Sequence, residues 1–131
     1  MIKRMLDTNI CIYLINQQPP EVVKEFSKYR KGEIVISAIT WGELCCGINK
    51  NGKQIIDALL EYLDVVPFDL RASEIFATLT VKHPNRKANF DRLIAAHALA
   101  IGVPLVTNNV SDFAVYQDSG LVVENWLSAG V

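Results

Sequence analysis

The sequence has few of the features that mark secreted, membrane-spanning or zinc-binding proteins. It has three cysteines, an odd number without the spacing of zinc ligands, and all lie in apolar helical runs: Cys11, Cys45 and Cys46. We therefore predict buried, reduced thiols. The apolar runs fall far short of the roughly 20 residues that span a bilayer, and Asp7 places a carboxylate too early for a signal peptide. These shortages favour a soluble, cytoplasmic protein that does not enter membranes.

Basic residues are missing from the last part of the chain, because neither Lys nor Arg follows Arg92. The formal net charge of −1 argues against a general nucleic-acid-binding domain. The basic residues instead form two groups, one within residues 1–31 and one around His83 that comprises Lys82, Arg86, Lys87 and Arg92. The average charge can therefore conceal basic patches beside an acidic site. His83 is either a phosphate contact or a solvated loop residue.

Short, continuously apolar runs alternate with helical patterns along the chain. The predicted strands cover residues 2–6, 34–36, 65–67, 103–107 and 120–123. The predicted helices begin near residue 10 and continue with residues 21–31, 38–49, 54–63, 70–83 and 90–101, each starting after a capping residue or a proline such as Ser37, Asp69 or Asn89. This order predicts an α/β fold whose mostly parallel sheet of four to five strands is covered on both faces. The length suits a single domain, residues 1–131.

Four acidic residues stand where strands end or helices begin. Asp7 ends the first strand, Asp91 lies in the first turn of its helix, and Asp112 lies in the polar loop 108–112. Glu43 is the only charged residue between Ser37 and Lys50, whereas a solvated helix face would carry more. Each acid alone is explained as a cap or a surface charge. Right-handed crossovers would nevertheless bring them to one rim of the sheet, where ligands of open α/β sheets bind.

Several carboxylates at one rim repel each other, and a cation is needed to neutralise them. Oxygen ligands alone select Mg²⁺ or Mn²⁺ over zinc. The matching chemistry is attack on a phosphodiester by metal-activated water, which would leave a 5′-phosphate and a 3′-hydroxyl. Such a mechanism needs no histidine, so we expect His97 to be a core or interface residue. Trp41 and Trp126 are likewise expected in the core or at an interface.

Four segments resemble the PIN domain, and more closely the VapC toxins of bacterial toxin–antitoxin pairs: Met5-Leu-Asp-Thr-Asn9, Ile39-Thr-Trp-Gly-Glu-Leu44, Asn89-Phe-Asp-Arg-Leu-Ile-Ala-Ala-His-Ala98 and Leu105-Val-Thr-Asn-Asn-Val-Ser-Asp-Phe113. The resemblance implies a three-layer α/β/α fold and a Mg²⁺- or Mn²⁺-dependent endoribonuclease that cuts structured RNA, with tRNA favoured over ribosomal RNA. It also implies a VapB-like antitoxin that takes the complex to operator DNA, and a homodimer.

The resemblance also assigns residues to the site. The catalytic and metal-binding quartet would be Asp7, Glu43, Asp91 and Asp112, and the polar residues that line the site would be Thr8, Asn9, Thr107 and Asn109. Asn109 competes with Asp112 for the fourth position. We further expect the basic residues Lys82, Arg86, Lys87 and Arg92 to hold the RNA backbone beside the metal.

Two other functions fit parts of the pattern. A phosphoacceptor receiver domain also has an acidic Mg²⁺ pocket on an α/β sheet. It needs a lysine near its last strand and a central strand that ends in an aspartate, whereas strand 34–36 ends on Ser37 and no lysine follows Arg92. A non-catalytic metal-binding or structural module predicts instead that the four acids lie apart.

Overall fold

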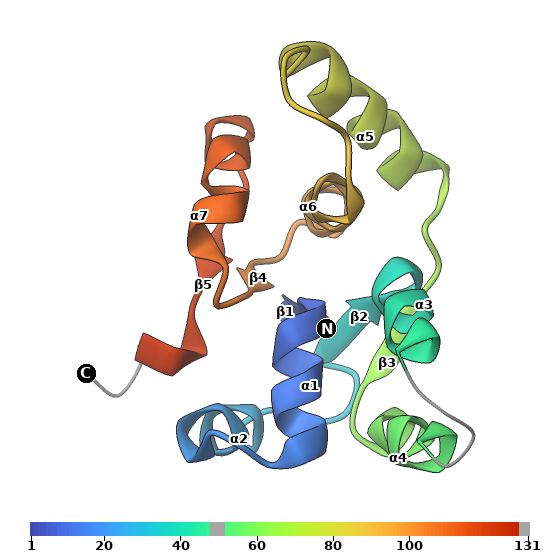
Figure 1. Ribbon diagram of the computed structural model, residues 1–131, viewed down its shortest axis with the longest axis vertical. Coiled ribbons are helices and arrows are strands. Elements are labelled where there is room, and N and C mark those ends of the chain that lie inside the picture. Colours follow the sequence, from blue (N-terminus) through green and yellow to red (C-terminus); the bar gives the residue numbers. More distant parts are fainter. Residues whose placement is uncertain (48–51, 129–131) are drawn as a thin grey trace.

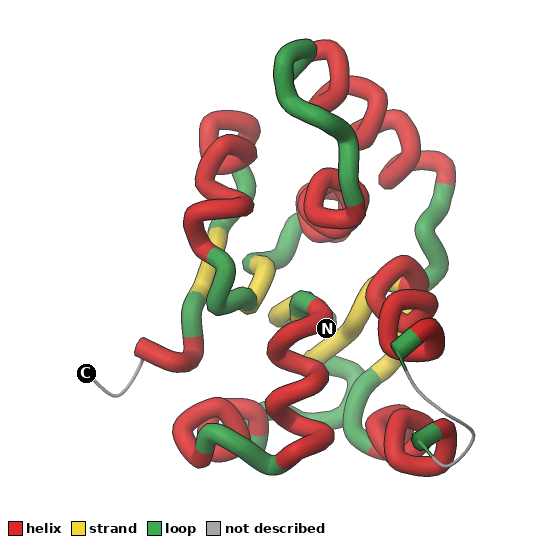
Figure 2. Tube along the Cα trace, viewed as in Figure 1, coloured by secondary structure: helices red, strands yellow, loops and turns green. Residues whose placement is uncertain are grey.

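A five-stranded parallel sheet forms the middle of the computed structural model, which describes residues 1–47 and 52–128. The strand order is β3-β2-β1-β4-β5, so the first strand of the chain is the central one (Figures 1 and 2). The strands are β1 (Arg4–Leu6), β2 (Ile34–Ser37), β3 (Asp64–Val66), β4 (Leu105–Val106) and β5 (Val123–Glu124). The predicted α/β class and the predicted number of strands are confirmed.

Helices cover both faces of this sheet (Figure 1). The α-helices are α1 (Thr8–Asn16), α2 (Pro20–Phe26), α3 (Ala38–Cys46), α4 (Lys53–Asp57), α5 (Leu70–Lys82), α6 (Phe90–Ile101) and α7 (Val110–Phe113). Three 3₁₀ segments follow α4, α7 and β5, namely η1 (Ala58–Glu61), η2 (Ala114–Ser119) and η3 (Trp126–Ser128). Helices α1, α2 and α4 lie on one side of the sheet and α5 and α6 on the other, which gives the three layers of an α/β/α fold.

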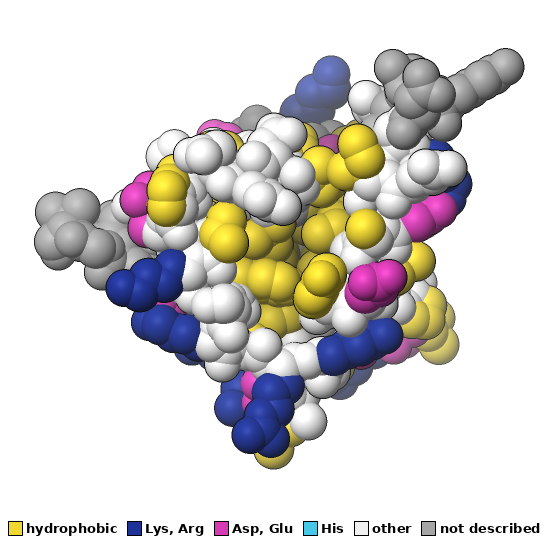
Figure 3. Space-filling view, turned by 90° about the horizontal axis from the view of Figure 1, so that it is seen from below, with side chains coloured by type: hydrophobic (Ala, Val, Ile, Leu, Met, Phe, Trp, Pro, Cys, Tyr) yellow, Lys and Arg dark blue, Asp and Glu magenta, His cyan; other side chains and the backbone are white. Residues whose placement is uncertain are grey.

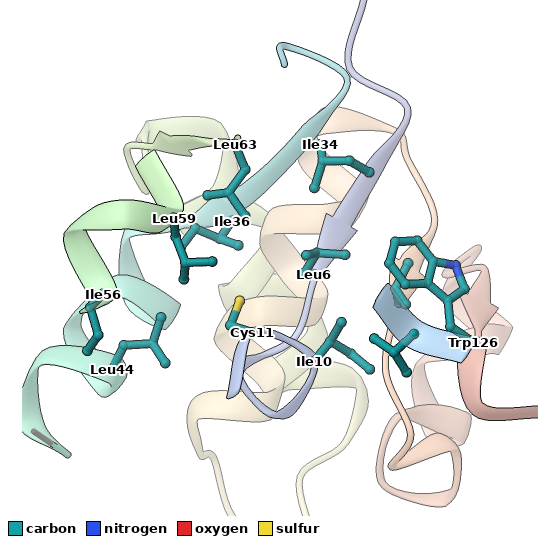
Figure 4. Packing of buried hydrophobic residues seen from close by; sticks show 12 residues of the cluster. Leu6, Ile10, Cys11, Ile34, Ile36, Leu44, Ile56, Leu59, Leu63 and Trp126 are labelled. Atoms are coloured by element: carbon teal, nitrogen blue, oxygen red, sulfur yellow. The ribbon is translucent and has the colours of Figure 1, made fainter. Parts of the chain in front are cut away.

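Apart from Arg4 and Ser37 at their ends, the central strands β1, β2 and β4 are apolar, because successive side chains enter different cores. Leu6 packs with Ile34, Ile36 and Val106 in a cluster that α1, α2 and η1 complete (Figure 4). Met5, the residue before Leu6, belongs to a second cluster built on α5, α6 and η2. A strand with two buried faces has no polar alternation, and this explains the continuous apolar runs of the sequence.

Side-chain caps fix the starts of three helices as predicted. The Ser37 hydroxyl accepts a hydrogen bond from the Ile39 amide at 3.0 Å, and the Asp69 carboxylate accepts one from the Ala72 amide at 2.9 Å. Asn89 accepts from the Arg92 amide at 3.2 Å. These bonds satisfy amides that have no partner within their own helix. The cap of α6 sets where Asp91 and Arg92 lie on the helix.

Several predicted boundaries need correction. The expected loop 108–112 contains the start of helix α7, so Asp112 is helical, and the expected helix 21–31 ends already at Phe26. Gly32 does not end that helix but forms a turn before β2 with φ of 96°. The last residues of the expected helix 38–49 lie outside the described residues. No helix of the described part is long and apolar enough to cross a membrane.

The prediction for the cysteines holds for one of the three. Cys11 is fully buried, and burial raises the pKa of its thiol. Cys45 is half-buried, however, and Cys46 is exposed near the end of α3, so the prediction of buried thiols is wrong for these two. An apolar helical run does not show which of its faces meets solvent. All three thiols are free.

Candidate active site

Asp7 lies at the carboxyl end of the central strand and also caps helix α1. It is only 4% exposed. One carboxylate oxygen accepts from the Thr8 amide at 2.7 Å, and the other accepts from the Thr107 hydroxyl at 2.7 Å. Burial raises the pKa of Asp7, and these two hydrogen bonds oppose that rise. The cap explanation and the functional explanation of Asp7 are therefore compatible, because each oxygen keeps a further lone pair.

Glu43 reaches the same rim from the helix that follows β2. Its Oε1 accepts a hydrogen bond from the Thr8 hydroxyl at 2.8 Å. Burial raises the pKa of Glu43, and the charge of Asp7 adds to the rise. Thr8 therefore connects two acids, because its amide binds Asp7 and its hydroxyl binds Glu43.

Asp91 has the most perturbed carboxyl of the quartet. Burial, followed by the charges of Asp7, Asp112 and Glu43, raises the pKa of Asp91 to about 6. The charge of Asp112 also raises the pKa of Asp7, although Asp112 itself is exposed on α7. Asp7, Glu43 and Asp91 thus each lie within the electrostatic field of another acid of the set, which favours a common site over four separate surface charges.

The donor set fits a hard divalent cation. All four groups are carboxylates, and their mutual repulsion would be relieved by an ion between them. Within residues 1–47 and 52–128, no three carboxylate, imidazole or thiol groups stand close enough to coordinate an ion as they are placed. The coordination shell is therefore not preformed, and the fit rests on the chemistry and charge of the donors.

The predicted polar residues supplement the acids to different degrees. Thr107 is fully buried, donates to Asp7 and accepts from the Asn109 amide at 3.0 Å, so it connects the end of β4 to Asp7. Asn9 and Asn109 are half-buried. Asn108 was not predicted. It donates to the Tyr13 hydroxyl at 2.7 Å and thereby joins the end of β4 to α1. Adjacent asparagines give no signal in the sequence as to which one faces inward.

The four basic candidates lie in different surroundings. Arg86 is exposed, donates to the Asp112 carbonyl at 3.3 Å, and its charge lowers the pKa of Asp91, so it belongs to the acidic rim. Lys87 is exposed beside it. Lys82 donates to Ser119 at 3.1 Å and lies 3.8 Å from the Asp118 carboxylate. Only Arg86 is therefore tied to one of the four acids.

The structure corrects the prediction that Arg92 holds the RNA backbone. This residue is 1% exposed and donates to three neutral oxygens inside the protein, so it cannot contact an RNA backbone. The sequence places it next to Asp91 and in a basic group. Adjacent residues of a helix point in different directions, however, and here one of them faces the rim and the other the interior.

Neither histidine is placed to act on a substrate at the rim. His97 is 2% exposed, lies 2.7 Å from the Ser37 hydroxyl, and packs against the edge of Phe68, which confirms its core position. Burial lowers the pKa of His97. The His83 side chain is largely covered and packs on the Tyr116 ring, so it is neither solvated nor free to bind phosphate.

Both tryptophans belong to the packing of the first cluster. Trp126 is fully buried and stacks on Tyr29, whereas Trp41 is half-buried at the edge of the cluster, with the Lys53 ammonium 5.6 Å from its ring centre. The core alternative is thus confirmed for Trp126.

An apolar groove lies away from the acids, on the face formed by α1, α2 and α4 with η1. Its volume is about 810 Å³, and its lining includes the large apolar residues Leu14, Phe26, Tyr29, Ile55, Leu59 and Tyr62. Figure 3 shows this hollow as a hydrophobic surface with both basic and acidic side chains around its edge. Ile55 and Tyr62 are more than half exposed, which is unusual for large apolar side chains and indicates a contact surface.

Fold and site together define the class of protein. The PIN domain family matches residues 4–117, and the chain therefore belongs to this family. Within the family it is of the VapC type. It is 34% identical to Ribonuclease VapC2 of Rickettsia felis over 131 aligned residues, covering 93% of this chain and 96% of that protein. It is also 34% identical to the tRNA(fMet)-specific endonuclease VapC of Shigella flexneri, covering 96% of this chain and 99% of that protein.

Solved structures support the same assignment. VapBC from Salmonella typhimurium, bound to DNA, matches with a TM-score of 0.86 and 28% identity over 96% of this chain and 99% of that chain. VapBC2 from Rickettsia felis, bound to a promoter DNA fragment, matches with a TM-score of 0.80 and 32% identity over 96% of this chain and 99% of that chain. Both are similar in fold along nearly the whole length.

Proposed function

We propose that this chain is a Mg²⁺- or Mn²⁺-dependent endoribonuclease toxin that cleaves structured RNA and so stops translation and growth. The observation that carries the proposal is that Thr8 joins Asp7 and Glu43 by hydrogen bonds, and that the charges of other acids of the set raise the pKa values of Asp7, Glu43 and Asp91. Their repulsion destabilises the folded protein unless a cation or a proton neutralises it. A site of this kind suits phosphodiester hydrolysis.

The acidic residues of the rim would have different roles in binding the cation and positioning water. Asp7 would hold the cation, because Thr8 and Thr107 fix the directions of its two oxygens. Asp91 and Asp112 would complete the acidic side, with Asp112 preferred to Asn109 because its charge acts on both Asp7 and Asp91. Glu43, oriented by the Thr8 hydroxyl, would bind the cation or position the attacking water.

A divalent cation bound there supplies activation of water and neutralises charge on the phosphate and the leaving oxygen. The attacking group is then water rather than the ribose 2′-hydroxyl, so the products carry a 5′-phosphate and a 3′-hydroxyl. Arg86 lies at the same rim, and it would contact flanking phosphates together with its exposed neighbour Lys87. The Shigella relative is named for tRNA(fMet), and we infer that tRNA is the substrate class here also.

We further propose that a VapB-type antitoxin occupies the apolar groove. The solved relatives are VapBC complexes, and this chain exposes an apolar surface large enough for several side chains of a partner helix. Lys31 and Glu61 at its edge would pair with an acidic and a basic residue of the partner. Ile55→Glu should then weaken antitoxin binding while the RNA cleavage rate stays unchanged. An unchanged affinity for the antitoxin would place the interface elsewhere.

The nuclease itself is tested by induced expression in a bacterium, with growth and total RNA followed for the wild type and for Asp7→Asn. We expect the wild type to stop growth and to yield a discrete RNA fragment whose ends are a 5′-phosphate and a 3′-hydroxyl. Asp57→Asn is the matched control, because Asp57 is paired with Lys53 outside the rim. Harmless expression of a folded wild type, or a 2′,3′-cyclic phosphate product, would falsify the mechanism.

A further inference from the structure

Arg92 is a buried cation whose hydrogen-bond acceptors among residues 1–47 and 52–128 are all neutral. Its Nε donates to the Tyr116 hydroxyl at 3.2 Å, its Nη1 to the Thr80 hydroxyl at 3.2 Å, and its Nη2 to the Arg86 carbonyl at 2.8 Å. Burial of a guanidinium without a carboxylate partner is costly, so such a residue is uncommon in a core. An apolar side chain of similar volume would fill the same space without that cost.

The three acceptors come from three different parts of the structure. Thr80 lies on α5, Tyr116 lies on η2, and Arg86 lies in the connection between α5 and α6. The Thr80 hydroxyl donates its own proton to the Phe76 carbonyl at 2.9 Å, so it is held as an acceptor for the guanidinium. Because the guanidinium is planar and rigid, it fixes these parts relative to one another, which a flexible ammonium would not do.

The segment held in this way carries Arg86, the basic residue whose charge acts on Asp91. The backbone carbonyl of Arg86 is bound by Arg92, while the side chain of Arg86 donates to the Asp112 carbonyl. The charge of Arg86 also lowers the pKa of Asp91. The backbone hydrogen bond therefore determines where an exposed cation stands at the edge of the acidic rim.

We propose that Arg92 is a positioning residue that holds the connection 83–89, so that Arg86 faces the acidic rim and contacts a phosphate of the RNA. The RNA part of this proposal rests on the proposed nuclease function. The positioning part rests only on the contacts of Arg92 and can be tested without RNA.

Limited trypsin digestion tests the positioning part, because Arg86 and Lys87 are themselves cleavage sites in the held segment. Arg92→Gln should speed cleavage after these two residues by about tenfold, since the segment opens locally more often. Cleavage after Lys24 and Lys28 of the α2 region should not change. Equal acceleration at every site would show a general loss of stability, and no acceleration would show that Arg92 does not hold the segment; either result overturns the proposal.

Arg71→Gln is the matched control. Arg71 also joins α5 to α6, through a 3.2 Å hydrogen bond to the Ala100 carbonyl, but at the other end of the helices. This variant should leave cleavage after Arg86 and Lys87 unchanged. If Arg92→Gln does not fold, Thr80→Val and Tyr116→Phe each remove one acceptor and should raise cleavage in the same segment by a smaller factor. If neither Thr80→Val nor Tyr116→Phe raised cleavage in this segment, the proposal would be overturned.

A double-mutant cycle tests whether Arg92 acts through Arg86. Binding of unfractionated tRNA is measured in an Asp7→Asn background, which prevents cleavage. Arg86→Ala and Arg92→Gln should each weaken binding about fivefold, and the double variant should bind no more weakly than either single variant. Multiplied effects would show that the two residues act independently and overturn the proposal. If the parent does not bind tRNA, the nuclease proposal fails, and digestion alone decides the positioning role.

Discussion

Strand β1 and the residue that follows it belong to two contrasting regions of the molecule, the apolar core and the acidic rim. Met5 and Leu6 are fully buried in opposite apolar clusters, and they stabilise the sheet from both faces. Asp7 follows at 4% exposure, where burial raises its pKa and makes its charge costly. The apolar clusters therefore stabilise the fold, whereas the acidic rim destabilises it. Strand β1 contributes to the clusters and positions Asp7 at the rim. Changes in the two regions should have opposite effects on stability and activity.

The largest effect is expected for Asp7→Asn. The rate of RNA cleavage should fall on the order of a thousandfold, because the group that fixes the cation is removed. The free energy of unfolding at pH 7 without divalent cations should rise by about 1 kcal/mol, since a buried charge and its repulsion are removed. Single-turnover cleavage and urea denaturation measure the two quantities. A loss of stability would contradict the prediction, because it would mean that the hydrogen bonds of Asp7 to Thr8 and Thr107 stabilise the fold more than its buried charge destabilises it.

The opposite pattern is expected for Leu79→Ala in the second cluster. Leu79 is 1% exposed, and its truncation should lower the free energy of unfolding by about 3 kcal/mol. The cleavage rate per folded molecule should stay near that of the wild type, because Leu79 is an apolar residue of helix α5 that packs in the second cluster. Activity is measured below the unfolding temperature, with the folded fraction determined by circular dichroism. A folded but inactive variant would remove the distinction between the two regions.

The pH dependence of stability should show how much the ionised carboxylates of the rim destabilise the folded protein. The pKa values of Asp7, Glu43 and Asp91 are raised in the folded state, that of Asp91 from 3.8 to about 6. The folded protein then binds more protons than the unfolded chain between these values, so the metal-free protein loses stability as the pH rises from about 4 to 6. Saturating Mg²⁺ should reduce this loss, and Asp91→Asn should reduce it without Mg²⁺. Urea denaturation between about pH 4 and 6, with and without EDTA, measures this dependence. A metal-free protein that became more stable as the pH rose would contradict the prediction.

The smallest effect is expected at the exposed edge of the rim. Arg86→Ala and Lys87→Ala together should weaken RNA binding several-fold and lower the slope of log affinity against log salt by about two, because two phosphates are no longer neutralised. Stability should hardly change, because both side chains are exposed. Lys24→Ala with Lys28→Ala, on the opposite layer, is the charge-matched control. An unchanged salt slope would exclude an interaction of these residues with phosphate.

The sequence predicted the features that depend on local pattern. Continuous apolar runs predicted a sheet buried on both faces, and Asp69 and Asn89 predicted two helix starts that the structure confirms. Crossover handedness limits where strand ends can lie and predicts that the acids share one rim; the raised pKa values of Asp7, Glu43 and Asp91 support this prediction. Their roles in the chemistry remain a prediction.

The features that the sequence did not predict depend on contacts between distant segments, which local pattern does not determine. Arg92 resembles its basic neighbours in sequence, but Tyr116 and Thr80 approach from other elements and take it into the interior. The connection from Asn108 to Tyr13 spans 95 positions, and the exposure of Cys46 depends on which face of α3 packs. Such features require the assembled fold.

The hydrogen bond from Thr107 to Asp7 also has a consequence for the time order of synthesis. The two residues are 100 positions apart, and β1 pairs directly with β4. Asp7 is synthesised 100 residues before Thr107, so it lacks this partner until the ribosome has added those residues. A growing chain therefore carries the first acid of the rim long before the rim exists. Early interruption of translation would release fragments in which this part of the site has not assembled.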